Sequence, residues 1–325
     1  MAKATLFASV AAVAVLATAA APAAAQVTLQ AAGASFPEAI YTTWFSAASA
    51  WNTVVKYAAV GSGAGQKRFA AGTVAFGASD ATLNDKAVAA IARGVVQIPM
   101  VGGAVAVVYN KPGCAVSLTQ AQLVKIFLGT VKNWAAVGCA AAPMRLVYRA
   151  DASGTTASFT TSLRAFDKAW ARVGAGKTVK WPVGVGKRGS SGVANFVAAT
   201  PNTLSYVSFG TAKARGLQIA ALQNAAGRAV KPTAATMVAG LSRIALDKAN
   251  RGADPNPSGA NSYPIVSYTW VLAYARGNKN LGALRRTLTY MLSPAAQKLA
   301  NGLGFVRLPV AVVKRSQAAV RSLRA

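Results

Sequence analysis

The sequence predicts an α/β fold built on mainly parallel sheets, and three observations support this. Short apolar runs of strand length alternate with amphipathic runs of helical period throughout the chain after residue 26. No internal repeat and no long low-complexity linker interrupts this alternation. Asp80 and Arg149 each stand at the end of a strand-like run, and in sheets of this kind ligands bind beyond the carboxyl ends of the strands. These two residues therefore mark a candidate binding site.

The first 25 residues have the pattern of a secretory signal peptide. Lys3 is followed by a long run of Ala, Val and Leu that ends in Ala23-Ala24-Ala25, which fits an A-x-A cleavage signal. The run is too short and too rich in Ala to favour a stable membrane anchor. No Cys lies near the cleavage point, so a lipid anchor there has no acceptor. We therefore expect an exported mature chain of roughly 300 residues without a lipid anchor, a length that suits two domains.

Strands follow one another along the chain with helices between them. The apolar runs of strand length cover residues 73–79, 104–109, 144–148, 204–209 and 265–274. Two segments rich in Gly, Pro or polar residues, 101–103 and 254–259, fit either crossings between domains or plain surface turns.

Two helices have clear beginnings in the sequence. Thr119 and Gln122 form a capping box that opens a helix, and Gly129 ends it. A second helix begins near Ser153, because Phe159 and Leu163 stand at helical spacing after it.

The chain is strongly basic. Lys and Arg total 35 against seven acids and no His, which gives a net charge of +28, or +27 once Lys3 leaves with the signal peptide. Such a charge favours nucleic acid, anionic surfaces or anionic ligands as partners. The basic residues are scattered, with no run longer than a pair. A solvated face is therefore the simpler interpretation, and a dedicated nucleic-acid groove is the alternative.

The shortage of carboxylates suggests an acidic external habitat. Only seven acids can change their charge between pH 7 and pH 3, so few ion pairs are at risk in that interval. We therefore expect the folded protein to keep most of its stability between pH 7 and pH 4.

The chain has two cysteines, Cys114 and Cys139. In an oxidising compartment such a pair is expected to form one disulfide, which contributes about 3 kcal/mol to stability in the loop-entropy description. Two buried free thiols are the alternative. With no His and no second cysteine pair, no metal site is expected, and nothing in the sequence calls for a cofactor.

The most informative segment covers residues 148–156. It has the pattern of a strand end, a tight loop with one cation and one carboxylate, and then the start of a helix. Ser153, Gly154 and Thr155 fall where a helix N-terminus exposes unpaired amide N–H groups, which suit an anion. Arg149 can add a planar, bidentate fork for an oxyanion. Taken alone, the segment also fits an ordinary helix cap, with Asp151 as an acid at the helix N-terminus.

Three further segments accompany that loop, at residues 32–37, 60–65 and 76–80. In this order and spacing, the four segments resemble those of the periplasmic phosphate-binding protein that feeds the ABC-type phosphate importer. Supporting stretches lie at 125–129, 178–184 and 263–265, so the resemblance covers nearly the whole mature chain. It implies two α/β lobes, each a mainly parallel sheet flanked by helices, with the ligand in the cleft between them. Lobe I is expected to hold residues 26–102 plus 262–325, and lobe II residues 103–261.

The resemblance assigns roles to residues of the first three segments. Ser35 keeps the hydroxyl of the family, and the backbone N–H of Phe36 is expected to donate to a phosphate oxygen. Ser62 matches the serine that donates from both hydroxyl and backbone. Asp80 matches the carboxylate that accepts a hydrogen bond from the ligand. Gly63 departs from the pattern, because the family often has a second Ser there.

The same resemblance covers the fourth segment. Arg149 matches the cation of the family's site, and Asp151 matches the acid that holds this arginine in place. Ser153, Gly154 and Thr155 match the donors at the start of the helix.

One carboxylate facing an anion has a chemical reason. Phosphate near neutral pH still carries at least one O–H, which Asp80 can accept, whereas sulfate carries none. A buried polar group left without a partner costs about 1–3 kcal/mol, and more when it is charged. The resemblance therefore implies a site that separates phosphate from sulfate through one acceptor among many donors.

The expected function is that of an exported, periplasmic solute-binding protein that closes on inorganic phosphate and delivers it to a membrane permease. We expect a monomer with no specific nucleic-acid partner and no enzymatic activity, since a chain without His cannot carry Ser-His-Asp chemistry. One alternative is a secreted phosphatase. Another is a binder of polyanions or a cell-surface adhesive protein on the same scaffold, which the net charge and the basic C-terminal stretch 314–324 favour.

Overall fold

A computed structural model describes residue 1 and residues 25–325. Nearly all of the expected signal peptide lies outside these described residues. Within them, no helix has the length and apolar character that a membrane crossing requires.

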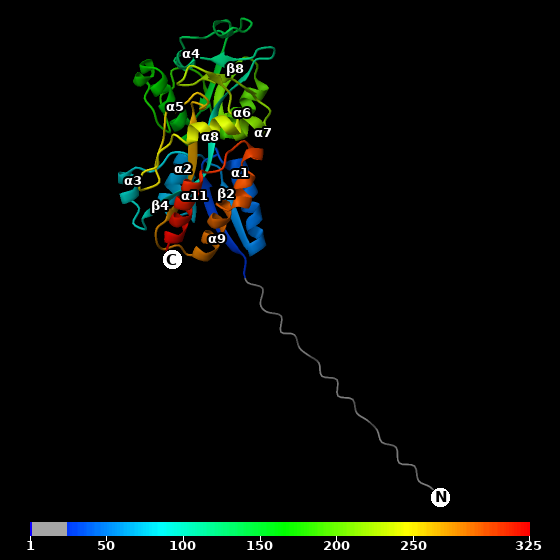
Figure 1. Ribbon diagram of the computed structural model, residues 1–325, viewed down its shortest axis with the longest axis vertical. Coiled ribbons are helices and arrows are strands. Elements are labelled where there is room, and N and C mark those ends of the chain that lie inside the picture. Colours follow the sequence, from blue (N-terminus) through cyan, green and yellow to red (C-terminus); the bar gives the residue numbers. More distant parts are fainter. Residues whose placement is uncertain (2–24) are drawn as a thin grey trace.

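The molecule has two lobes, arranged one above the other in Figure 1. A nine-stranded sheet runs through both in the order β2-β1-β3-β12-β4-β8-β6-β7, with β9 also paired to β4. The bounds of its strands are β1 Val27–Gly33, β2 Thr53–Ala58, β3 Phe76–Ser79, β4 Val95–Asn110, β6 Arg145–Arg149, β7 Val185–Lys187, β8 Thr203–Ser208, β9 Gln218–Ile219 and β12 Val266–Tyr274. A small second sheet joins β5 Ser117–Leu118, β10 Ala221–Gln223 and β11 Ala229–Val230.

The expected α/β class and its two lobes are confirmed, with one refinement to the sheet. Strands β1, β2 and β3 pair in parallel in the first lobe, and β6 pairs in parallel with β7 and β8 in the second. In the middle of the sheet, however, β12 is antiparallel to β3 and β4, and β4 is antiparallel to β8 and β9. Parallel pairing therefore describes the outer strands of each lobe, and the strands that link the lobes are antiparallel.

Strand β4 passes from one lobe into the other without a break. It pairs with β12 as far as Ala104 and with β8 from Val105 onward. The sequence predicts only its second half as a strand, and residues 101–103 as a crossing or a turn. The pairing register shifts where Trp270 faces Pro99 and Thr269 faces Val101, which is how a proline is accommodated inside a sheet.

The two glycines of β4 serve close packing rather than a turn. A Cβ on Gly102 would lie 2.4 Å from a methyl carbon of Leu241, and a Cβ on Gly103 would lie 2.9 Å from the ring of Phe36. Both glycines are buried, and they directly precede the point at which β4 changes its partner from β12 to β8. The crossing between lobes is therefore a strand with no side chain at two consecutive positions.

Helices cover the sheet on both lobes. The first lobe holds α1 Glu38–Ser46, α2 Ser62–Ala70, α3 Asp85–Ala89, α9 Leu281–Met291, α10 Pro294–Lys298 and α11 Val310–Ser322. The second lobe holds α4 Gln120–Phe127, α5 Gly154–Phe166, α6 Gly189–Ala199 and α7 Phe209–Ala214, and α8 Ala234–Leu241 lies where the lobes meet (Figure 1). The capping box of Thr119 and Gln122 is confirmed at the start of α4.

The basic C-terminal stretch forms helix α11, which packs on the first lobe. Its residues Val312 and Val320 are buried, and its Ser316 Oγ donates to the carbonyl of Pro99 at 2.8 Å. Lys314 and Arg321 are exposed on this packed helix, whereas Arg315 is half-buried and donates to the carbonyl of Leu246 at 2.9 Å.

The expected disulfide is confirmed. Cys114 and Cys139 are bonded, with their Cα atoms 5.6 Å apart. The bond ties the loop after β4 to the end of the 3₁₀ helix Trp134–Val137 in the second lobe.

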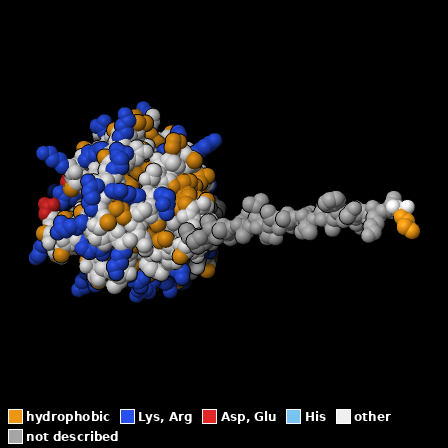
Figure 2. All heavy atoms as spheres, turned by 90° about the horizontal axis from the view of Figure 1, so that it is seen from below, with side chains coloured by type: hydrophobic (Ala, Val, Ile, Leu, Met, Phe, Trp, Pro, Cys, Tyr) orange, Lys and Arg blue, Asp and Glu red, His pale blue; other side chains and the backbone are white. Residues whose placement is uncertain are grey.

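Lys and Arg side chains are spread over the whole face that Figure 2 shows from below, with few Asp and Glu side chains among them. Three ion pairs join described residues, and two of them share Arg251, which contacts Asp85 at 2.5 Å and Asp247 at 2.8 Å. The distribution in Figure 2 matches the simpler interpretation of the charge, a solvated basic face.

Candidate anion-binding site

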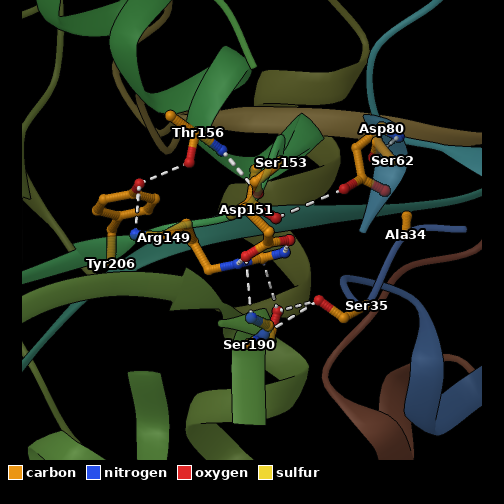
Figure 3. Close-up of polar contacts among 12 residues, drawn as sticks. Ala34, Ser35, Ser62, Asp80, Arg149, Asp151, Ser153, Thr156, Ser190 and Tyr206 are labelled. Atoms are coloured by element: carbon orange, nitrogen blue, oxygen red, sulfur yellow. Dashed lines mark hydrogen bonds and ion pairs between the residues drawn. The ribbon is translucent and has the colours of Figure 1, made fainter. Parts of the chain in front are cut away.

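The predicted site residues meet in the cleft between the lobes (Figure 3). Ser35, Ser62 and Asp80 come from the first lobe, after β1, at the start of α2 and after β3. Arg149 is the last residue of β6, and the helix α5 begins five residues later. The carboxyl ends of β1, β3 and β6 therefore face one another across the cleft, which is where open α/β sheets bind ligands.

Arg149 is held by a bidentate ion pair within its own loop. Its Nε donates to Asp151 Oδ1 at 2.7 Å and its Nη2 to Asp151 Oδ2 at 2.5 Å. The Arg149 side chain is 2% exposed and that of Asp151 is 7% exposed. Burial alone raises the pKa of Asp151, but the hydrogen bonds and charge of Arg149, with the N–H of Gly189, outweigh it and hold that pKa below its usual value.

Ser190 belongs to the site and was missed by sequence reasoning. Its Oγ lies 2.8 Å from Ser35 Oγ and accepts a hydrogen bond from Arg149 Nη1 at 3.2 Å, and its N–H donates to Ser35 Oγ at 3.1 Å. Ser190 is buried in the first turn of α6. The signal available was the Gly-Ser-Ser-Gly run of residues 189–192, a helix start with small polar residues.

The guanidinium of Arg149 keeps donors for a ligand. It has five N–H donors, and the bonds to Asp151 and Ser190 use three of them. Two donors therefore remain on a buried cation that points into the cleft (Figure 3).

Asp80 supplies the opposite chemistry. Its Oδ1 is buried with no hydrogen-bond partner among the described residues, and its Oδ2 accepts from Thr155 Oγ1 at 3.5 Å. Burial raises the pKa of Asp80 to about 7, because the Thr269 hydroxyl and the charge of Arg149 offset the loss of solvation only in part. An unpartnered buried carboxylate oxygen indicates a missing donor, such as a ligand O–H.

The start of α5 lies beside Arg149 on the second-lobe side of the cleft. Ser153 caps the helix by accepting from the N–H of Thr156 at 3.2 Å, and the hydroxyl of Thr156 lies 2.6 Å from that of Tyr206. Gly154 fits directly against the first lobe, since a Cβ there would lie 2.6 Å from Ser62 Oγ and 2.8 Å from the Asp80 Cβ. The first amides of α5 are thereby brought up to Ser62 and Asp80.

The lobes are closed on one another in this structure. The N–H of Gly63 on α2 donates to the carbonyl of Ala152 at 2.8 Å, directly across the cleft. A Cβ on Gly63 would lie 2.4 Å from that of Ala152, so the residue that departs from the family pattern is packed against the opposite loop. Phe36 is buried with its ring edge-on to Phe305, at 5.8 Å between centroids.

The arrangement is that of an anion site with one acceptor. Arg149, three serine hydroxyls and the first amides of α5 can donate, and Asp80 can accept. Among the described residues, no group of His, Cys, Asp and Glu side chains has the geometry to hold a metal ion. The ligand that uses all of these groups is an oxyanion that carries a proton.

Comparison with known proteins gives the family. A family model described as a PBP superfamily domain matches residues 18–300. The phosphate-binding protein PstS of Methanocaldococcus jannaschii is 32% identical in an alignment of 337 positions, gaps included, that covers 90% of this chain and 85% of that protein. The chain belongs to the PstS phosphate-binding protein family. The PstS protein of Haemophilus influenzae is 34% identical over 301 residues, covering 87% of this chain and 89% of its own.

A solved structure shares the fold of this chain. It is that of a high-affinity periplasmic phosphate-binding protein bound with phosphate, which aligns with a TM-score of 0.74 at 23% identity. The alignment covers 90% of this chain and 93% of that one. The two-lobed architecture is thus shared along nearly the whole described chain.

We expect this PstS family member to keep its stability from pH 7 to pH 4 without ligand. Asp80 binds its proton more tightly in the folded state, where its pKa is about 7, than at the ordinary value of 3.8, so acidification through this interval adds stability. The pKa of Asp151 lies below 3.8, so its stabilising contribution is present above that value and is lost only at lower pH. Thermal unfolding of phosphate-free protein across this interval tests the prediction.

The Asp80→Asn variant is the control for this pH series, because it should lose the gain in Tm on acidification. A marked fall of the wild-type Tm between pH 7 and pH 4 would contradict the prediction.

Proposed function

We propose that this protein is an exported, periplasmic solute-binding protein that encloses inorganic phosphate between its lobes and delivers it to the permease of an ABC-type importer. The names of its relatives support phosphate as the ligand. The observation that carries the proposal is the buried, unpartnered Asp80 Oδ1 on a wall opposite the free donors of Arg149. That pair of features suits an oxyanion with an O–H better than one without.

The proposed contacts divide between donors and one acceptor. Asp80 accepts the O–H of phosphate, Arg149 donates as the local cation, and Asp151 orients Arg149. The remaining oxygens receive hydrogen bonds from hydroxyls and backbone N–H groups of Ser35, Phe36, Ser62, Ser153, Gly154 and Thr155. The bonds of Ser190 to Ser35 and Arg149 support its role in orienting both.

We propose lobe I as residues 26–102 plus 262–325 and lobe II as residues 103–261, moving about the crossing strand β4. One loop inside the second range is tied to the first lobe. Asn250 donates to the carbonyl of Gln97 at 3.1 Å and accepts from Trp270 and Arg315, at 2.7 and 3.0 Å. This loop therefore follows lobe I when the lobes open.

The protein is proposed to act as a monomer and without catalysis. A chain without His offers no imidazole base, and the relatives are named as binding proteins. The net positive charge contributes to the rate of anion capture, and added salt reduces that contribution.

The Asp80→Asn variant tests the proposal through selectivity. Wild-type protein should prefer phosphate over sulfate by about a hundredfold or more, since sulfate leaves a buried carboxylate oxygen without a donor. In Asp80→Asn that ratio should fall below about tenfold, because the amide can donate to sulfate. Calorimetric titration of phosphate-stripped protein with both anions measures the ratio.

Asp85→Asn is the matched control, since Asp85 is an exposed acid on α3 away from the cleft. It should leave the ratio unchanged. Equal affinity of the wild type for the two anions, or weak binding that salt abolishes, would sink the proposal and leave charge alone as the attraction.

A further inference from the structure

The two sides of the cleft are also in contact outside the binding site, through Lys177 and Gln66. Lys177 lies in the loop before β7 of the second lobe, and Gln66 lies on α2 of the first. Lys177 Nζ donates to Gln66 Oε1 across the lobe boundary. Gln66 is buried and Lys177 is half-buried. The three ion pairs among described residues do not include Lys177, so its partner in this contact is a neutral amide.

At one end of this contact, Gln66 holds the turn that presents Asp80. Gln66 Nε2 donates to Ser79 Oγ at 2.9 Å and to the carbonyl of Ala81 at 2.8 Å, on either side of Asp80. Ser79 Oγ also bonds the carbonyl of Ala81 at 2.5 Å. The side chain that receives Lys177 therefore fixes the backbone around the acceptor of the site.

At the other end, the backbone of Lys177 holds the donors. Its carbonyl accepts from the N–H of Ser153 at 2.9 Å, at the cap of α5. The neighbouring Gly176 N–H donates to Thr160 Oγ1 on the same helix at 3.1 Å. The Lys177 loop is thus fastened to the element that carries Ser153, Gly154 and Thr155.

We propose that Lys177 and Gln66 form a latch that keeps the lobes closed over the bound anion and slows its release, an inference that rests on the proposed function. The contact joins the backbone around Asp80 to the cap of α5, so lobe opening must break it. Burial lowers the pKa of Lys177, and the like charge of Lys67 lowers it further. The hydrogen bond to the neutral amide of Gln66 offsets only part of the cost of burying the Lys177 charge. The contact therefore stabilises the closed state weakly enough for the lobes to open again.

Stopped-flow kinetics with phosphate test the latch. Lys177→Met should raise the dissociation rate about tenfold, because it removes a charged donor from a half-buried contact, and should change the association rate by less than about twofold. Lys177→Arg should keep release slow. Lys180→Met, which removes the same charge at an exposed position three residues on, should leave both rates unchanged. In a Gln66→Leu background, Lys177→Met should add less than about a twofold change.

A second arm separates the latch from the proposed function. Failure of wild-type protein to bind phosphate contradicts the proposed function. In that case the latch is tested by small-angle X-ray scattering of the two ligand-free proteins, in which the wild type should be more compact than Lys177→Met. Phosphate release from Lys177→Met as slow as from wild type overturns the latch. Where phosphate does not bind, equal compactness of the two proteins overturns it as well.

Discussion

Arg149→Ala is expected to lower phosphate affinity about a thousandfold or more. The substitution removes the cation with its two free donors, and charge-assisted hydrogen bonds are the stronger kind. It also leaves Asp151 as a buried carboxylate without its counter-ion, next to the anion it would then repel. Breaking such a buried pair from one side typically costs about 3–5 kcal/mol. Calorimetric titration with phosphate and thermal unfolding measure the two effects.

Two further variants distinguish loss of a ligand contact from loss of fold. Arg145→Ala removes the same charge from the exposed start of β6 and should bind phosphate like wild type. Arg149→Ala combined with Asp151→Asn should recover part of the lost stability without recovering binding, because no buried charge is left alone. Recovery of binding in that double variant would mean that Arg149 serves the fold and does not contact phosphate.

Gly154→Ala is expected to lower phosphate affinity about a hundredfold while the separate lobes stay folded. A Cβ at this position would lie 2.6 Å from Ser62 Oγ and 2.9 Å from the backbone nitrogen of Asp80, contacts that real Cβ atoms do not make. The residue is the first of α5, and the atoms that its Cβ would meet belong to Ser62 and Asp80 on the opposite side of the cleft. A steric block there therefore destabilises the closed state. With the lobes held apart, the ligand can contact the residues of only one lobe at a time.

Gly192→Ala is the control for this substitution. Gly192 lies on helix α6, and the nearest atom to a Cβ there is the Lys187 Cβ at 3.8 Å. The variant should bind phosphate normally, since Ala is also the better helix former. Small-angle X-ray scattering with saturating phosphate should show Gly154→Ala in a more open form than both the wild type and Gly192→Ala. Wild-type affinity and compactness in Gly154→Ala would show that the helix start does not close against Asp80.

The strands that carry the site were predictable because each signal is local. Residues 73–79 and 144–148 were apolar runs that end at a polar residue, and the structure places β3 and β6 there. Strand β4 was only half predicted, because Pro99 and Gly102-Gly103 have the composition of a break. What overrides that local signal is distant in the sequence: the register shift opposite Trp270 and the approach of Leu241 to Gly102.

The site was predictable to the extent that its residues stand in motifs of fixed order. The resemblance placed Ser35, Asp80 and Arg149, and the structure brings them into one cleft. The run of residues 189–192 marks only a helix start around Ser190, and Lys177 and Gln66 stand in no motif. Their roles depend on how far the lobes close, which no spacing within one segment encodes. Ser35 and Ser190 are 155 residues apart in the sequence, yet their hydroxyl oxygens lie 2.8 Å apart.

The surplus of surface cations affects how the protein can be handled and observed. With a net charge of +28 and only seven acids, the protein migrates as a cation over the whole range in which those acids titrate. Uptake of one phosphate alters so large a charge by a small fraction. Ion exchange and native electrophoresis should therefore fail to resolve loaded from empty molecules. Methods that respond to molecular shape should resolve them.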